Sequence, residues 1–237
     1  MREPNTPTQA TSGARILLLV LMFSLGFPLL LAVRTFLFQP FNIPAASGYP
    51  NLVVGDYVFV SKSSYGFGPY SIPFGLGPKT GRWWGKAPER GDLAVFRFPK
   101  DTRVDYVKRV VGLPDDRLQM IGGVLHINDK PVLFEPVQLL AEFYRESPDI
   151  TYFRETLPNG RTYVIANMVD DGAADSTAEY VVPPGHYFVM GDHRDNSADS
   201  RFLDAVGYVP EENFIGPVVL RVFNSHGMSV FNRPAEW

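Results

Sequence analysis

The most apolar stretch of the chain is an uncharged run of 18 residues, Ile16 to Val33, bracketed by Arg15 and Arg34. A helix needs roughly 17–25 such residues to cross the hydrocarbon of a bilayer, so the run predicts a transmembrane anchor over residues 15–37. A cleavable signal peptide and the buried helix of a soluble protein are the alternatives. Arginines lie on both sides of the run, so the positive-inside rule favours one orientation only weakly. In that orientation the tail 1–14 lies inside the cell and the rest of the chain lies outside.

Beyond the anchor, short runs of β-branched and aromatic residues alternate with Gly and Pro, a pattern typical of strands joined by turns. We expect a strand, a turn and a second strand within residues 52–61, strands at 92–98, 105–111 and 187–190, and hairpins at 122–132 and 153–165. The predicted fold is all-β. We expect a barrel or sandwich core formed by residues 38–116 plus 185–237, interrupted by a smaller β-rich insertion at 117–184.

The amino-acid composition mainly excludes classes of function. The 237 residues carry a net charge of −3, with a pI near 5.8, which gives no electrostatic reason to bind nucleic acid. The chain contains no Cys, so thiol chemistry, disulfides and Cys-based metal sites are excluded. We expect no cofactor and no metal.

The first set of candidate functional residues is the predicted loop 191–207. It contains ten polar or charged side chains directly after an apolar strand. The spacing of Asp192, Asp195 and Asp199 hints at a calcium loop, but the Gly and Glu of an EF-hand are absent at its sixth and twelfth positions. A Ser–His–Asp triad that uses His193 or His186 is a second alternative.

Two earlier segments, 43–56 and 105–116, contain Ser47 and Lys108. A serine hydroxyl is a poor nucleophile at neutral pH and needs an adjacent base. A lysine can be that base only when it is neutral, so its pKa must lie well below about 10.4. In a strand Lys108 shares a face with Tyr106, but apolar residues lie on both faces, so the periodicity does not decide which face is buried.

Together these three segments resemble the type I signal peptidases, which are membrane-anchored serine proteases with a lysine base. The resemblance implies that Ser47 is the nucleophile and Lys108 the general base, and that the Ser47 backbone N–H binds the oxyanion. Many relatives have a serine where this chain has Ala45, so one oxyanion donor is missing here. The resemblance also implies supporting residues around the base: Ser197 bonded to the amine, an Asp199–Arg201 charge pair, and Asp192, Arg194 and Asn196 bracing the loop.

The same resemblance implies a substrate and a location. The substrates would be signal peptides of exported preproteins, cut after a small residue at −1 with another at −3, and lying extended beside strand 105–111. The catalytic part would face the extracytoplasmic side of the cytoplasmic (inner) membrane, held by a single span in the lipid bilayer. The positions that match pocket walls, which could equally be plain core, are Phe41, Ile43, Pro44, Leu52, Val58, Val95, Tyr106 and Val107.

Several readings stay open at this point. Gly48 and Tyr49 replace the Met and following residue usual in the family, which leaves room for a Ser/Lys peptidase with one dedicated substrate, such as a conjugation pilin. The second alternative is not an enzyme: it is a membrane-tethered β-domain that binds peptides without cutting them. In the aromatic loop 64–88, Trp83 and Trp84 are expected at the bilayer surface, although they could instead cover the barrel.

Overall fold

The computed structural model describes residues 11–72, 77–137, 150–169 and 171–227. Predictions for most of the tail 1–14, and for parts of the aromatic loop, the insertion and the C-terminal end, lie outside the described residues.

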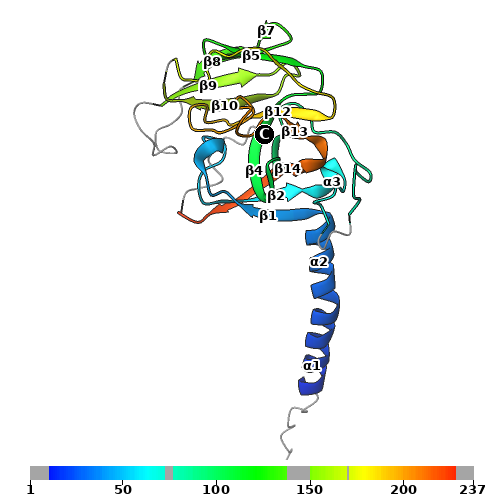
Figure 1. Cartoon of the computed structure of the whole chain (residues 1–237). Coiled ribbons are helices and arrows are strands. Elements are labelled where there is room, and N and C mark those ends of the chain that lie inside the picture. The colour runs from blue at the N-terminus through cyan, green and yellow to red at the C-terminus, as the bar shows by residue number, and fades with distance from the viewer. Residues whose placement is uncertain (1–10, 73–76, 138–149, 170, 228–237) are drawn as a thin grey trace, which may run out of the picture.

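A helix at the N-terminal end projects from a body of β-sheets (Figure 1). It consists of α1 (Thr11–Leu21), a π-helical turn (Met22–Gly26) and α2 (Phe27–Phe36). Pro28 accounts for the π-helical turn, because its ring has no N–H to donate and clashes with a carbonyl of the preceding turn. The window Gly13–Leu30 has a mean hydropathy of 2.0 and none of it is buried. The expected apolar N-terminal helix is confirmed, and its length and composition fit a membrane span.

The main sheet contains seven antiparallel strands in the order β1-β2-β14-β3-β4-β12-β13. The strands are β1 (Phe38–Asn42), β2 (Asp56–Ser61), β3 (Leu93–Phe98), β4 (Asp101–Gly112), β12 (His186–Met190), β13 (Val209–Pro210) and β14 (Phe214–Asn224). Only the end of β4, from Arg109 onward, pairs with β12, while β3 pairs along the other side. Among the described residues, one edge of the first half of β4 is therefore without a strand partner.

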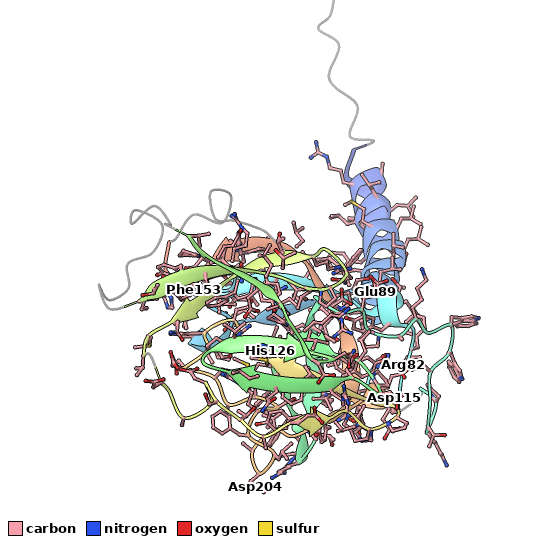
Figure 2. The ribbon with its side chains drawn as sticks, turned by 90° about the horizontal axis from the view of Figure 1, so that it is seen from above. Arg82, Glu89, Asp115, His126, Phe153 and Asp204 are labelled. Atoms are coloured by element: carbon pink, nitrogen blue, oxygen red, sulfur yellow. The ribbon has the colours of Figure 1, made fainter. Side chains whose placement is uncertain are left out.

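Two smaller sheets are formed by the residues between β4 and β12. The first has the order β11-β5-β6-β7, with β5 (Arg117–Ile121), β6 (Val124–Ile127), β7 (Lys130–Pro131) and β11 (Tyr180–Val181). The second has the order β10-β9-β8, with β8 (Leu133–Val137), β9 (Thr151–Thr156) and β10 (Thr162–Asn167). Both lie at the end of the body away from the anchor helix (Figure 1). Seen from above, Arg82 and Glu89 lie on the side of the helix and Phe153 on the other side (Figure 2).

The all-β fold is confirmed, and the turns explain two of its hairpins. Asn128 and Asp129, between β6 and β7, have φ values of 52° and 65°, as the tight turn of a two-residue hairpin requires. The hairpin expected at 153–165 is β9 and β10, which pair from Thr156↔Thr162 onward. The part of the chain that the structure describes also contains α3 (Lys62–Tyr65) and the 3₁₀ turns Ala46–Gly48 and Glu211–Asn213.

One expected strand is wrong. Residues 52–54 lie in an irregular turn, and β2 pairs instead with β14 and with β1, which starts immediately after the anchor. Leu52 is fully buried, and its N–H donates to the Gly48 carbonyl at 2.8 Å. These apolar residues fill the space beneath a turn, a position that the period-two pattern of a strand does not distinguish from a sheet face.

The insertion and the main sheet share a hydrophobic core. One cluster joins Val111, Phe188 and Met190 of the main sheet to residues of the insertion such as Leu118 and Ile165. The division of the chain at 117 and 184 stays a prediction, but the two parts pack as continuous apolar interior. The insertion is therefore able to support residues of the main sheet directly.

Candidate active site

Ser47 lies in the loop between β1 and β2, inside the 3₁₀ turn Ala46–Gly48. Two main-chain hydrogen bonds close the base of this loop: the Ile43 N–H donates to the Asp56 carbonyl, and the Gly55 N–H donates to the Ile43 carbonyl, both at 2.8 Å. The Ser47 side chain is half-buried. The loop thus holds a serine at the surface on a fixed backbone.

Lys108 lies on β4 and is 4% exposed, in a part of the strand that is buried on both faces, since Arg109 is 1% exposed. Its Nζ donates to Ser197 Oγ at 3.0 Å and lies 5.9 Å from the centre of the Tyr106 ring. Ser47 and Lys108 line the same cavity, which has a volume of about 350 Å³. The structure therefore brings together a hydroxyl and an amine that are far apart in sequence.

The environment of Lys108 makes its neutral amine more populated than that of an exposed lysine. Burial lowers its pKa from the ordinary 10.5 to about 8, against the attraction of Asp199 and Asp192, while Arg201 lowers it further. Near pH 7 about a tenth of such amines are neutral, compared with about one in three thousand for an ordinary lysine. A lysine in this position can accept a proton.

The loop that carries Ser197 is held by a buried charge pair. Arg201 donates to both carboxylate oxygens of Asp199 at 2.9 Å, and the Gly191 N–H donates to the same carboxylate at 2.9 Å. Burial acts to raise the pKa of Asp199, but Arg201 and these hydrogen bonds, including one with Ser197, hold it below its usual value. Asp199 is thus a fixed anion beside the hydroxyl that contacts Lys108.

Two further buried ion pairs tie the loop to other elements. Arg109 donates to Asp192 through Nε at 2.8 Å and Nη2 at 2.7 Å, and its guanidinium lies 4.0 Å from the centre of the Tyr163 ring. Arg194 donates to both oxygens of Glu155 at 2.6 Å. Tyr163 and Glu155 belong to the inserted hairpin, so the insertion contacts the two arginines that hold this loop.

The cavity contains only some of the expected pocket residues. Its lining includes four of them, Ile43, Pro44, Tyr106 and Val107, and also Asn196, which is exposed at its edge. The other four, Phe41, Leu52, Val58 and Val95, do not line it and belong to a hydrophobic cluster between the strands. Residues that were not expected in the lining are Ala46, Val104, Asp105 and Ala198, and Ala45 lines it as well.

The alternative chemistries find less support in the geometry. Neither His193 nor His186 lines the cavity, and the His193 ring packs against Tyr49 with centroids 5.7 Å apart. Asp195 accepts hydrogen bonds from two backbone N–H groups, and its neighbours in the supposed calcium loop are bound to arginines. Within the described ranges, no group of three or more His, Asp or Glu side chains is placed to hold a metal ion.

Sequence reasoning missed three residues that support the site. The sequence alone assigned Arg109 no role, although its position next to the proposed base was a signal that could have been used. Glu155 is 39 residues from its partner Arg194, and Asn51 is 141 residues from its partner Asp192. No local pattern connects residues so far apart in the chain.

The chain is similar to known peptidases over most of its length. The family model described as Signal peptidase, peptidase S26 matches residues 14–223. The signal peptidase I of Rickettsia typhi is 37% identical over 224 residues, which cover 91% of this chain and 82% of that protein. The signal peptidase I of Rickettsia conorii is 40% identical over 193 residues, which cover 78% and 71%. A solved structure, a signal peptidase I from Enterococcus faecalis V583, is 27% identical with a TM-score of 0.35, covering 56% of this chain and 98% of that one.

Proposed function

The chain belongs to the signal peptidase family, peptidase S26, and is a serine endopeptidase; from this premise we propose that it removes signal peptides from exported preproteins with Ser47 as nucleophile and Lys108 as general base. The observation that carries the proposal is the cavity that both residues line, with Lys108 buried and its pKa lowered to about 8 by that burial. No cofactor enters the mechanism.

The first half of the reaction forms an acyl-enzyme. Neutral Lys108 takes the proton of Ser47 as the serine oxygen attacks the scissile carbonyl carbon. The resulting oxyanion is bound by the Ser47 backbone N–H, since Ala45 offers no hydroxyl. The Lys108 ammonium then gives its proton to the leaving amine, so that the C–N bond breaks.

The second half releases the signal peptide. Lys108, neutral again, takes a proton from a water molecule that attacks the ester carbonyl. Collapse of this second oxyanion breaks the ester bond and returns the proton to Ser47. Ser197 supports both halves, because its hydroxyl is 3.0 Å from Lys108 Nζ and limits the directions in which the amine can point.

The free edge of β4 is suited to an extended peptide. Residues 104–108 of β4 line the cavity, and among the strands that the structure describes they pair with β3 alone. A peptide can add there as a further strand, with main-chain hydrogen bonds that do not depend on its sequence. The opposite wall contains Ile43, Ala45 and Ala46, and such a wall favours the small residues that we propose at −1 and −3.

The membrane orientation is part of the proposal. None of the apolar window Gly13–Leu30 is buried in the protein, and a single residue separates the end of α2 from β1, which fixes the β-sheet body close to the bilayer. We place the tail 1–14 in the cytoplasm and the body on the extracytoplasmic side of the inner membrane, where exported preproteins emerge. Trp83 and Trp84 are 46% and 83% exposed and are proposed to contact the headgroup region.

Cleavage of a preprotein with an Ala-x-Ala site by the purified full-length chain tests the assignment. We expect turnover in the parent and its loss in Ser47→Ala and Lys108→Ala. Lys62→Met is the matched control, because Lys62 is also buried with its pKa lowered to about 8, by burial and then by Arg34 and Arg97, but it does not line the cavity. Retained turnover in Lys108→Ala, or equal loss in Lys62→Met, would reject the dyad.

A further inference from the structure

The carboxylate of Asp192 is shared by two elements of the site. Its Oδ1 accepts from Arg109 Nε at 2.8 Å, and its Oδ2 accepts from Arg109 Nη2 at 2.7 Å. Oδ2 also accepts from Asn51 Nδ2 at 2.7 Å. Arg109 follows Lys108 on β4, and Asn51 lies four residues after Ser47, so one carboxylate lies between the base and the nucleophile loop.

Asn51 is fixed on more than one side. It is 2% exposed, and its Nδ2 also donates to the Val164 carbonyl of β10 at 2.7 Å. The main-chain carbonyl of Asn51 accepts a hydrogen bond from Arg221 Nη1 of β14 at 2.7 Å. An amide with both N–H groups in use and a bound main chain has little freedom to shift.

A main-chain hydrogen bond is a second connection between the Ser47 loop and the segment that begins at Asp192. The His193 N–H donates to the carbonyl of Ser47 itself at 3.1 Å. The Asn51 side chain and this hydrogen bond therefore attach the Ser47 loop to two consecutive residues, Asp192 and His193. The chain that begins at Asp192 also carries Ser197, which contacts Lys108.

We propose that Asn51 is a positioning residue: its side-chain amide joins the loop of Ser47 to Asp192, the carboxylate that holds the strand of Lys108 through Arg109. This inference rests on the proposed function, because it concerns the distance between that nucleophile and that base. Asn51 does not line the cavity, so it contacts neither the substrate nor the reacting atoms.

Loss of the Asn51 amide has a defined consequence. It leaves the Val164 carbonyl without this donor and lets the Ser47 loop move relative to β4. A misplacement of about 1 Å can cost on the order of 10²-fold in rate. Movement of the Ser47 loop, which lines one cavity with Lys108, also admits water to that amine and so favours its ammonium form.

The test compares Asn51→Ala with Asn224→Ala in the full-length protein. Asn224 is a matched control because it is 8% exposed and also donates to one carbonyl, that of Val54 at 3.1 Å, and to one carboxylate, Asp56 Oδ1 at 2.8 Å. Neither partner lines the cavity: Val54 and Asp56 lie at the closed base of the Ser47 loop. Asn51→Thr keeps one donor and serves as the conservative variant.

We expect kcat of Asn51→Ala to fall about 10²-fold with KM within a few-fold of the parent. Asn224→Ala should keep kcat within a few-fold, and Asn51→Thr should recover most of the loss. The acid limb of kcat/KM should move to higher pH in Asn51→Ala, because hydration returns Lys108 toward its ordinary pKa while the charged groups that face it, Asp199, Asp192 and Arg201, remain. The midpoint of this limb does not depend on the folded fraction, so a less stable variant still gives an answer.

Equal kcat in Asn51→Ala and Asn224→Ala would overturn the inference. A lower kcat with an unmoved acid limb and a lower melting temperature would overturn it too, because that result describes a structural role alone. Failure of the proposed function is separate: it would appear as turnover in Lys108→Ala, whatever Asn51→Ala does.

Discussion

Replacing Lys108 with Met should make the protein inactive and more stable near neutral pH. Folding lowers the pKa of this lysine from 10.5 to about 8, chiefly by burial. Below about pH 8 the amine is protonated in both states, so the folded state bears the full cost of a buried ammonium. Between about pH 8 and 10.5 the unfolded chain binds more protons, so stability rises with pH and the cost disappears.

The magnitude follows from the size of the pKa shift. The difference between 10.5 and about 8, at about 1.4 kcal/mol for each unit of pKa, corresponds to roughly 3–4 kcal/mol in the free energy of unfolding. Met has a similar length and no charge, so Lys108→Met should gain up to this amount near pH 7 and almost none near pH 10.5. Function here opposes stability, since the reactive amine is the destabilising group.

Chemical unfolding of the full-length protein in detergent, followed by circular dichroism at both pH values, measures the difference. Lys86→Met is the control, because Lys86 is exposed and a surface change of this kind should be within about 0.5 kcal/mol of the parent. Equal or lower stability of Lys108→Met near pH 7 would refute the reasoning, as would a gain that persists near pH 10.5.

The remaining predictions concern rate and packing. kcat/KM should rise about tenfold per pH unit and level off near pH 8, because neutral Lys108 is the active form; a limb near pH 6.5 would indicate a histidine base instead. Ala45→Ser should raise kcat by at least about tenfold if its hydroxyl reaches the oxyanion bound by Ser47, since one such donor can be worth roughly 2.7–4 kcal/mol; an unchanged kcat in steady-state cleavage assays would show that another group already fills this role. Glu155→Ala should lower the free energy of unfolding by about 3–5 kcal/mol, because it leaves the buried Arg194 unpaired; a loss below about 1 kcal/mol in denaturant titrations would contradict this.

Local patterns were informative where a physical rule acts over a few residues. Runs of β-branched and aromatic residues between turn residues identified the hairpin of β9 and β10, and an uncharged run of sufficient length identified the apolar helix. The same rules misassigned residues 52–54, because a buried apolar side chain looks alike in a strand and beneath a turn. The pattern also did not decide whether Lys108 is buried, because valines lie on both faces of β4, and the structure buries both faces from Lys108 onward.

The sequence by itself determined the fold class, the apolar helix and, through three short motifs, the family to which the chain belongs. Only the tertiary structure decided that Lys108 is buried, that Asp192 pairs with Arg109 and that Asn51 and Glu155 each bond a residue of the loop 191–207 that is distant in the chain. The reason is physical: burial and charge pairing depend on groups that approach through space, and residues separated by many tens of positions leave no periodic trace in the chain.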